Sequence, residues 1–529
     1  MCAALAVALA LAFVLATAPA HGRPQSQRSR LGAQGRTTTP GRARVSRPPA
    51  QRQPAPVIRR RPELAHAEAS IAPAGPTIGL NASFFGLSTE YWALPRYERH
   101  MSIFERVLAL AHVPGDGPMI LRVGGDSADH TYWDPGARTL PADSFRLTQG
   151  WLQRARTLVR SANLKLILDL NLAANSPTMA AQLARVALEE LPPGSVLGFE
   201  IGNEPDLYGR EHRPSSVRVT GTFTAADYVQ EFRAYGRALR PVAPGIPLIG
   251  PSVADPLADL GWIARLIAGD RPALGVVSAH RYPLSACVAR TSPEYPTIAR
   301  LLSELAAADM ARSLAPAVRL SDRAGLPFRL TELGSVTCGG LRGVSTSFAT
   351  ALWAPDALFE LSRAGVEGVD VHIRADAVNA PFTLGDRGLT AHPLLYGLLL
   401  FVRTLGPDAQ LLALRPRAAP SSHLKVWAVK VAGGALHVLL IDKGPRSVGV
   451  ALRLPATAPA TVQRLLAPSI NASSGVTLAG QWLGRDGRWH GRRKLSTITR
   501  GPQGYELTMP GYSAALVSVQ LPGGGVRLA

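Results

Sequence analysis

The segment 196–205 reads VLGFEIGNEP, and it decides the fold class of this chain of 529 residues. Its first six residues form a short apolar run typical of a buried β-strand, and the run ends in polar residues and a proline. Amphipathic helical patterns flank it at residues 178–191 and 225–239. A buried strand between two helices is the repeating unit of an α/β fold with a parallel sheet.

Seven more apolar runs of this kind occur along the chain, at residues 82–88, 119–124, 165–170, 246–250, 275–279, 328–330 and 366–373. Further helical patterns separate them, at residues 97–111, 147–162, 260–267, 297–315 and 346–364. Eight strands that alternate with helices predict a (β/α)8 TIM barrel. An open doubly wound sheet is the alternative, but no glycine-rich nucleotide-binding motif follows the first run.

Residues beyond about 395 have a different pattern. An apolar helix is expected at 394–405, and after it short runs with alternating apolar residues are separated by turns. This pattern predicts a C-terminal antiparallel β-sandwich. The expected fold class is therefore α/β, with a catalytic barrel over residues 73–400 and a sandwich over 401–529 whose role is support.

The first 20 residues are expected to be a secretory signal peptide, because an apolar run is followed by Ala18-Pro19-Ala20. The protein would then be secreted, periplasmic or held at the cell surface, with no membrane span after cleavage of the signal. The alternative is an uncleaved anchor, since no Lys or Arg precedes the apolar run and the Arg-rich flank favours the cytoplasmic side.

Residues 21–72 are expected to be a disordered linker rich in arginine and proline. Much of the net charge of +20 is concentrated there, because residues 21–62 hold eleven arginines and no acidic residue. The rest of the chain is only weakly basic, which argues against a nucleic-acid partner. The alternative role of the segment is a polycation that adheres to acidic polysaccharide or cell wall.

Polar side chains follow six of the eight predicted strands, at the end where a barrel carries its active site. They include Glu90, Asp126, Asn171, Glu204, His280 and Glu332. Glu204 and Glu332 follow the fourth and seventh strands. Opposed carboxylates suit the cleavage of a glycosidic bond, because one must protonate the leaving oxygen while the other attacks C1 or activates water. A salt bridge to a neighbouring arginine is the alternative role for either glutamate alone.

Several short motifs around this pair resemble glycoside hydrolase family 79. They are Leu121-Arg122-Val123-Gly124-Gly125, Ile201-Gly202-Asn203-Glu204-Pro205, Leu330-Thr331-Glu332, Gly339-Gly340 and Ser513-Ala514-Ala515-Leu516-Val517. That family includes bacterial and fungal β-glucuronidases and heparanase, within a clan of retaining glycosidases. The resemblance extends from about residue 78 to about residue 521 and so covers both expected domains.

The resemblance implies a retaining hydrolase that cleaves β-linked glucuronic acid, or a related uronic acid, at a terminal or internal position of a glycan. Glu204 then matches the general acid/base and Glu332 the nucleophile. The matching sugar-binding positions are Asn203 for the 2-hydroxyl, Glu90 and Asp126 for outer hydroxyls, His280 and Tyr282 in the same subsite, and the backbone N–H groups of Gly339 and Gly340 for the uronate carboxylate.

One position departs from the pattern of the family. Thr337 stands where the family usually has an aromatic hydroxyl, so Arg281 and Arg342 are further candidate carboxylate ligands. A solvated surface charge is the alternative role for each arginine.

Two other functions stay open from the sequence: a non-catalytic module that binds acidic glycans, and a glycosidase of the same clan that takes a neutral sugar. A metal hydrolase would need a motif such as H-x-H or H-E-x-x-H, and the sequence contains neither. No metal and no cofactor are therefore expected. The oligomeric state cannot be read from the sequence.

Two cysteines, Cys287 and Cys338, remain after removal of the signal peptide. They follow the sixth and seventh predicted strands, which are neighbours in a barrel, so their loops rise side by side from one face. An even pair in an exported chain favours a disulfide, with two buried free thiols as the alternative. Such a bridge would restrain the loop that carries Gly339 and Gly340.

Overall fold

A computed structural model describes residues 65–522, apart from 72–76, 82, 114, 135, 137–138, 209–221 and 419–422. The expected signal peptide and most of the expected linker lie outside the described residues. Within the described part of the chain, no helix is long and apolar enough to span a lipid bilayer.

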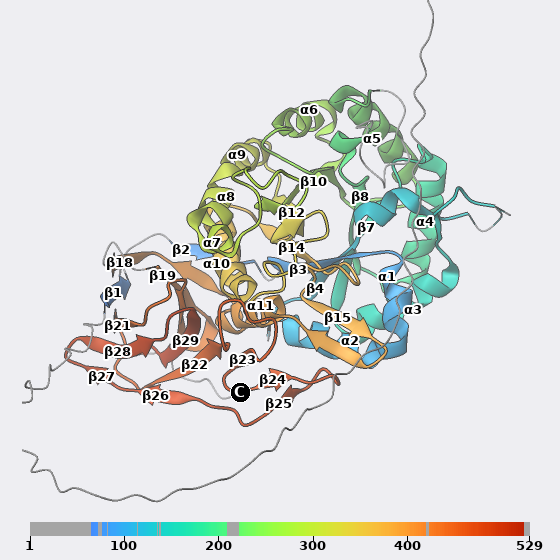
Figure 1. Ribbon diagram of the computed structural model, residues 1–529. Coiled ribbons are helices and arrows are strands. Elements are labelled where there is room, and N and C mark those ends of the chain that lie inside the picture. The colour runs from blue at the N-terminus through green and yellow to red at the C-terminus, as the bar shows by residue number, and fades with distance from the viewer. Residues whose placement is uncertain are drawn as a thin grey trace, which may run out of the picture. The chain divides into compact units, whose positions relative to one another are not determined.

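A closed barrel is formed by eight parallel strands: β3 (Phe85–Glu90), β4 (Met119–Gly124), β7 (Leu164–Leu170), β8 (Val196–Ile201), β9 (Leu248–Val253), β10 (Leu274–Arg281), β12 (Phe328–Leu333) and β14 (Gly368–His372). Around the barrel their order is β10-β12-β14-β3-β4-β7-β8-β9, which confirms the predicted barrel (Figure 1). The strands are largely buried because side chains fill the barrel on one face and helices cover the other.

The helices that accompany the barrel are α1 (Ala93–Tyr97), α2 (Met101–Ala111), α3 (Gln149–Ser161), α4 (Pro177–Glu190), α5 (Ala225–Leu239), α6 (Leu260–Asp270), α7 (Ile298–Leu302), α8 (Ala308–Ser313), α9 (Ala315–Arg323), α10 (Ala349–Arg363) and α11 (Pro393–Thr404). α5 begins where the sequence predicts, because Thr224 and Asp227 form a capping box. The single helix expected at 297–315 is instead divided into α7 and α8. Ser303 ends α7 in an extended conformation, and its hydroxyl donates to the carbonyl of Arg300.

Two further sheets use the strands β1 (Ala65–Ile71), β2 (Thr77–Gly79), β17 (Gln410–Leu412), β18 (Leu414–Ala418), β19 (Leu424–Lys430), β20 (Ala435–Asp442), β21 (Val448–Arg453), β22 (Ala460–Leu466), β23 (Thr477–Leu478), β26 (Ser496–Ile498), β27 (Arg500–Gly501), β28 (Gly504–Met509) and β29 (Ser513–Gln520). One sheet has the order β18-β1-β21-β28-β27 and the other β2-β17-β19-β20-β29-β22-β23, with β26 paired to β22. Antiparallel pairs predominate in both, as expected for the C-terminal region. Apolar side chains of both sheets share one buried cluster, among them Val438 and Leu440 of β20 and Val450 and Leu452 of β21.

Two short strands that precede the barrel belong to these sheets. β1 lies between β18 and β21, so the expectation of a disordered linker is wrong for Ala65–Ile71. β2 pairs with β17, outside the barrel. Ala67 and Ala69 are buried in the shared cluster, while Glu68 between them pairs with Arg453. Two alanines give only a weak hydrophobic signal in the sequence. The segment becomes a strand because it pairs with strands that are distant in sequence.

α10 packs against one of the two C-terminal sheets, the one that contains β19 and β20. The ring of Phe359 stacks on Trp427 of β19 with a centroid separation of 5.3 Å. Asp356 is fully buried, accepts a hydrogen bond from Trp427 Nε1 at 2.9 Å and pairs with the ammonium group of Lys443. Loss of one partner would leave an uncompensated buried charge, so the two parts depend on this contact for stability.

Candidate active site

Glu204 stands on a sharp turn at the carboxyl end of β8. Gly202 has a φ of 80°, and a Cβ at that position would lie 2.7 Å from the side chain of Leu172. Glu204 itself adopts φ 47° and ψ 54°, in the left-handed region. Its backbone N–H donates to the carbonyl of Ser252 at 3.0 Å and so holds the turn in place. Backbone strain of this kind at a strand end is typical of functional sites.

Glu332 lies at the carboxyl end of β12, where three side chains hold its carboxylate. Arg122 Nη1 donates to Oε2 at 3.2 Å, and the hydroxyl of Tyr282 donates to Oε1 at 2.7 Å. His372 Nδ1 lies 3.0 Å from the same Oε1. The three partners come from β4, from the segment after β10 and from β14, so closure of the barrel is what gathers them around Glu332.

The two glutamates lie close to each other. One carboxylate oxygen of Glu204, one of Glu332 and one ring nitrogen of His280 all lie within 4.8 Å of one another. His280 Nδ1 is 3.0 Å from Glu204 Oε1. The side chains of Glu204 and Glu332 are 13% and 9% exposed, so both carboxylates keep some access to solvent.

The charges around Glu332 favour its ionised form. Burial alone would raise the pKa of Glu332, but the charges of His372, His280 and Arg122 hold that pKa well below its usual range. Burial alone would lower the pKa of His372, whereas Glu332 and Glu90 raise it to about 10. Glu332 is therefore a carboxylate paired with an imidazolium at neutral pH.

Arg122 ties several site residues together beneath the two glutamates. Its side chain is fully buried and donates to Glu200 Oε2 at 2.7 Å and to Asp169 Oδ2 at 2.9 Å. It also donates to Asn203 Oδ1 at 2.9 Å. An amide whose oxygen accepts from Arg122 presents its NH2 group as a donor, which is the polarity that a sugar hydroxyl oxygen needs.

The predicted sugar ligands Glu90 and Asp126 lie beside Arg374, just beyond the end of β14. Glu90 is buried, and its Oε2 accepts the backbone N–H of Ser127 at 2.8 Å. Burial would raise the pKa of Glu90, but hydrogen bonding and charge from His372, together with the charge of Arg374, lower it. Arg374 Nη1 donates to Asp126 Oδ2 at 3.2 Å. These side chains continue the polar surface that begins at Glu332.

The loops after β10 and β12 lie side by side. They pair through the short strands β11 (Leu284–Ser285) and β13 (Val336–Thr337), and Cys287 and Cys338 form a disulfide with a Cα separation of 6.0 Å. Gly339 and Gly340 follow with φ values of 75° and 91°. The N–H of Gly340 donates to the carbonyl of Thr337 at 3.4 Å, within a tight turn.

The structure also places at this site residues for which the sequence analysis predicted no role. Arg122 belongs to one of the motifs that resemble family 79, but its ion pair with Glu332 was not predicted from the sequence. His372 and Arg374 were missed because the strand-end rule was not applied to the eighth strand, where it would have found both. Of the two other arginines considered, Arg281 pairs with Asp255 at 3.6 Å.

A metal ion would find one candidate set of ligands here. Glu204, His280 and Glu332 are the described residues whose ligand atoms lie close enough together to hold one. The carboxylate of Glu332, however, is already bound by Arg122, His372 and Tyr282. Two of these three partners are cationic, so the surroundings suit an anion and disfavour a second cation.

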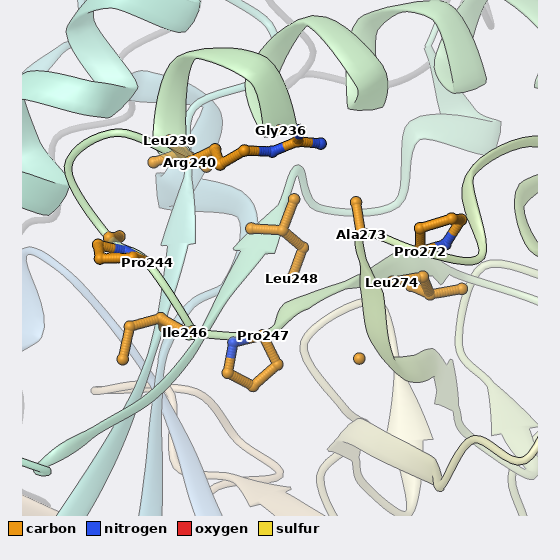
Figure 2. Close-up of a pocket in the computed structure, with 13 residues that line it drawn as sticks. Gly236, Leu239, Arg240, Pro244, Ile246, Pro247, Leu248, Pro272, Ala273 and Leu274 are labelled. Atoms are coloured by element: carbon orange, nitrogen blue, oxygen red, sulfur yellow. The ribbon is translucent and has the colours of Figure 1, made fainter.

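A separate hollow of about 410 Å³ lies at the opposite end of the strands. It is lined by Leu239 and Arg240 at the end of α5, and by the starts of β9 and β10 (Figure 2). Apolar residues and prolines dominate its wall, with Leu248 between Arg240 and Pro247, and Leu274 beside Pro272 (Figure 2). The catalytic face of a barrel is at the carboxyl ends of its strands, so this hollow is not part of the candidate active site.

Solved structures with a similar fold include two glycosidases. The structure of a 4-O-α-L-rhamnosyl-β-D-glucuronidase from Fusarium oxysporum superposes with a TM-score of 0.69 at 18% sequence identity, and the match covers 85% of this chain and 100% of that one. A family 51 arabinofuranosidase from Xanthomonas axonopodis has a TM-score of 0.64 at 16% identity, over 86% of this chain and 100% of the other. This chain therefore shares the barrel fold of these two enzymes.

A comparison of sequences also finds a distant relative. A β-glucuronidase from Aspergillus niger is 25% identical over a match of 308 residues that covers 52% of this chain and 55% of that protein. The chain thus spans about half the length of this curated relative. No family model matches the chain.

Proposed function

We propose that the protein is a retaining glycoside hydrolase that cleaves β-linked glucuronic acid, or a related uronic acid, from glycans or glycoconjugates. The observation that carries the proposal is the separation of at most 4.8 Å between carboxylate oxygens of Glu204 and Glu332. Retaining enzymes hold their two carboxyl groups about 5–5.5 Å apart, whereas inverting enzymes leave about 6.5–9.5 Å for a water molecule. The short separation supports the retaining mechanism.

Glu332 acts as the nucleophile and Glu204 as the acid and then the base. In the first step a carboxylate oxygen of Glu332 forms a bond to C1, the glycosidic C–O bond breaks, and the proton of Glu204 passes to the leaving oxygen. In the second step Glu204 accepts a proton from water, the water oxygen bonds to C1, and the bond to Glu332 breaks. The low pKa of Glu332, which His372, His280 and Arg122 maintain against burial, suits a nucleophile that must be ionised.

Asn203, Glu90 and Asp126 orient the sugar in this proposal. Arg122 fixes the amide of Asn203 so that its NH2 group donates to the 2-hydroxyl, a contact that strengthens in the transition state. The N–H of Gly339 stays a proposed carboxylate ligand, and that of Gly340 joins it on release of its 3.4 Å hydrogen bond to the carbonyl of Thr337. Arg374 adds a positive charge on the same face, where it also pairs with Asp126.

The preference for a uronic acid rests on likeness to other proteins. One sequence relative is a β-glucuronidase, and one structure of similar fold is a rhamnosyl-glucuronidase. A neutral sugar is the second candidate, because arabinofuranosidases have the same fold. We further propose export of the protein through the signal peptide, and a β-sandwich that supports the barrel.

A panel of aryl glycosides tests this function. The intact protein should release phenol from a β-glucuronide at a rate well above that from the matching β-glucoside or α-arabinofuranoside. Glu332→Gln should abolish that release, while Glu367→Gln, which changes an exposed glutamate on the loop after α10, should not. Turnover of the arabinofuranoside alone would support the neutral-sugar candidate. Binding of glucuronides with no turnover of any substrate would support a non-catalytic module.

A further inference from the structure

A groove of about 530 Å³ lies between the barrel and the C-terminal region. One wall is formed by Tyr396 of α11 and residues 389–391 at the end of the hairpin of β15 (Phe382–Gly385) and β16 (Gly388–Ala391). The other wall is formed by residues 474–477 and 482–485. A groove of this size is sufficient for one or two sugar rings. None of its lining residues belongs to the candidate active site.

Trp482 offers an exposed aromatic surface in this groove. It begins the hairpin of β24 (Trp482–Leu483) and β25 (Trp489–His490), and it is 48% exposed. The ring stacks on His490 with a centroid separation of 6.4 Å, and its edge lies against Gly491. An aromatic side chain left open in a groove offers a flat apolar face, and the C–H face of a pyranose ring packs well on indole.

Positive charge surrounds the same hairpin. Five exposed cations occur within ten residues, namely Arg485, Arg488, Arg492, Arg493 and Lys494. Asp486 is the one carboxylate among them, and it is bound to His490 Nε2 at 3.0 Å. Over the described residues, none of the five cations is paired with a carboxylate. Burial, with the charge of Arg493, lowers the pKa of Arg403 to about 10. Like charges therefore accumulate here without compensation.

Hydrogen bonds hold this cationic segment beside the groove. The carbonyl of Arg485 accepts the backbone N–H of Leu389, in the opposite wall, at 2.8 Å. Arg106 Nε of α2 donates to the carbonyl of Asp486 at 2.8 Å. The backbone N–H of Lys494 donates to the carbonyl of Ala479 at 2.7 Å. The backbone that carries these charges is therefore held in place, so a ligand need not order the segment itself when it binds.

We propose that the groove and its flanking cations, the Trp482 surface, bind an acidic polysaccharide at a second point, apart from the catalytic carboxylates. The rings of the sugar chain would pack on Trp482, and its uronate carboxylates would pair with Arg492, Arg493 and Lys494. The proposal rests on the proposed function, because it takes the same class of glycan as ligand. A second attachment point raises the local concentration of a polymeric substrate at the active site.

Direct binding tests this surface with a size-defined hyaluronan oligosaccharide as the probe. The full-length chain carries Glu332→Gln, to prevent turnover, and serine at the eleven arginines of residues 21–62, to remove their contribution. In this background Trp482→Ala should weaken binding about tenfold, and Trp482→Phe should restore most of it. The combined changes Arg492→Ser, Arg493→Ser and Lys494→Ser should weaken binding of the oligosaccharide further. They should also make the affinity less sensitive to salt concentration.

The matched control removes the same charge elsewhere. Arg265→Ser, Arg319→Ser and Arg323→Ser change three exposed cations on α6 and α9, and binding should be unaffected. Equal weakening by this control, unchanged affinity in Trp482→Ala, or equally tight binding of single-stranded DNA would each overturn the proposal. The proposed function is tested separately, by the assay of the unmodified protein with the aryl glycoside panel. Loss of binding in Trp482→Ala supports the surface even if that panel shows no hydrolysis.

Discussion

His372 Nδ1 lies 3.0 Å from the oxygen of Glu332 that also accepts a hydrogen bond from Tyr282. The imidazolium helps to keep the pKa of Glu332 low despite burial. We expect His372→Asn to raise that pKa by about 1 unit or more, because an opposite charge at this distance is removed. Glu332 must be ionised to react, so activity is lost as the pH falls through its pKa. The acidic limb of kcat/KM for an aryl glucuronide should therefore move to higher pH.

The control for this measurement is His66→Asn, which changes an exposed histidine on β1. Its pH profile should overlie that of the unmodified protein. An acidic limb that stays in place in His372→Asn would show that Arg122 and His280 are sufficient to keep Glu332 ionised.

Glu204→Ala should remove the basic limb of the kcat/KM profile. The basic limb reports loss of the proton that the general acid donates, so without Glu204 no such ionisation remains. With a poor leaving group the rate should fall about 10²–10⁴-fold, and with an activated phenol the loss should be smaller. A basic limb that persists with the activated phenol would place the proton donor elsewhere.

The first sugar released should be the β anomer. Attack by Glu332 inverts C1 and attack by water inverts it again, so the product keeps the configuration of a β-linked substrate. NMR of the reaction, recorded before mutarotation, distinguishes the anomers. Initial release of the α anomer would contradict the retaining mechanism that the short separation of Glu204 and Glu332 supports.

Removal of the Cys287–Cys338 disulfide should impair turnover before it unfolds the barrel. The bridge joins the loops after β10 and β12, which carry Tyr282 and the two glycines 339 and 340. A misplaced hydrogen-bond donor weakens binding of the transition state, so we expect Cys287→Ser with Cys338→Ser to lower kcat/KM about tenfold. The assay is run at a temperature where circular dichroism shows the variant folded. Full activity in that variant would limit the bridge to a stabilising role.

Lys443→Met should destabilise the protein by about 3–5 kcal/mol, because it leaves the buried carboxylate of Asp356 without its cation. Denaturant unfolding followed by fluorescence measures the loss. Asp356→Asn added to Lys443→Met should restore part of the stability, since the amide oxygen still accepts from Trp427 Nε1 and no charge is stranded. No recovery in the double variant would mean that lost packing, and not the isolated charge, accounts for the effect.

The repeating pattern of the sequence was sufficient to predict the barrel. An apolar run as short as 196–201, set between two helical patterns, favours a strand in a parallel sheet that helices cover on both faces. The positions of the site residues were equally predictable. Polar residues directly after parallel strands all lie at the same face of the barrel, the face of the carboxyl ends. Glu204 and Glu332 were found in this way, and the structure brings their carboxylate oxygens within 4.8 Å.

The sequence alone determined the eight strands and the two opposed glutamates, because both follow from local alternation of apolar and polar residues. Only the tertiary structure decided which charges surround Glu332. Closure of the barrel pairs β14 with β3 and β12, and this brings His372 beside Glu332 and near Glu90. It likewise decided the strand at Ala65–Ile71, which becomes ordered by pairing with β18 and β21. Such contacts join residues far apart in the chain, and a local pattern cannot encode their energies.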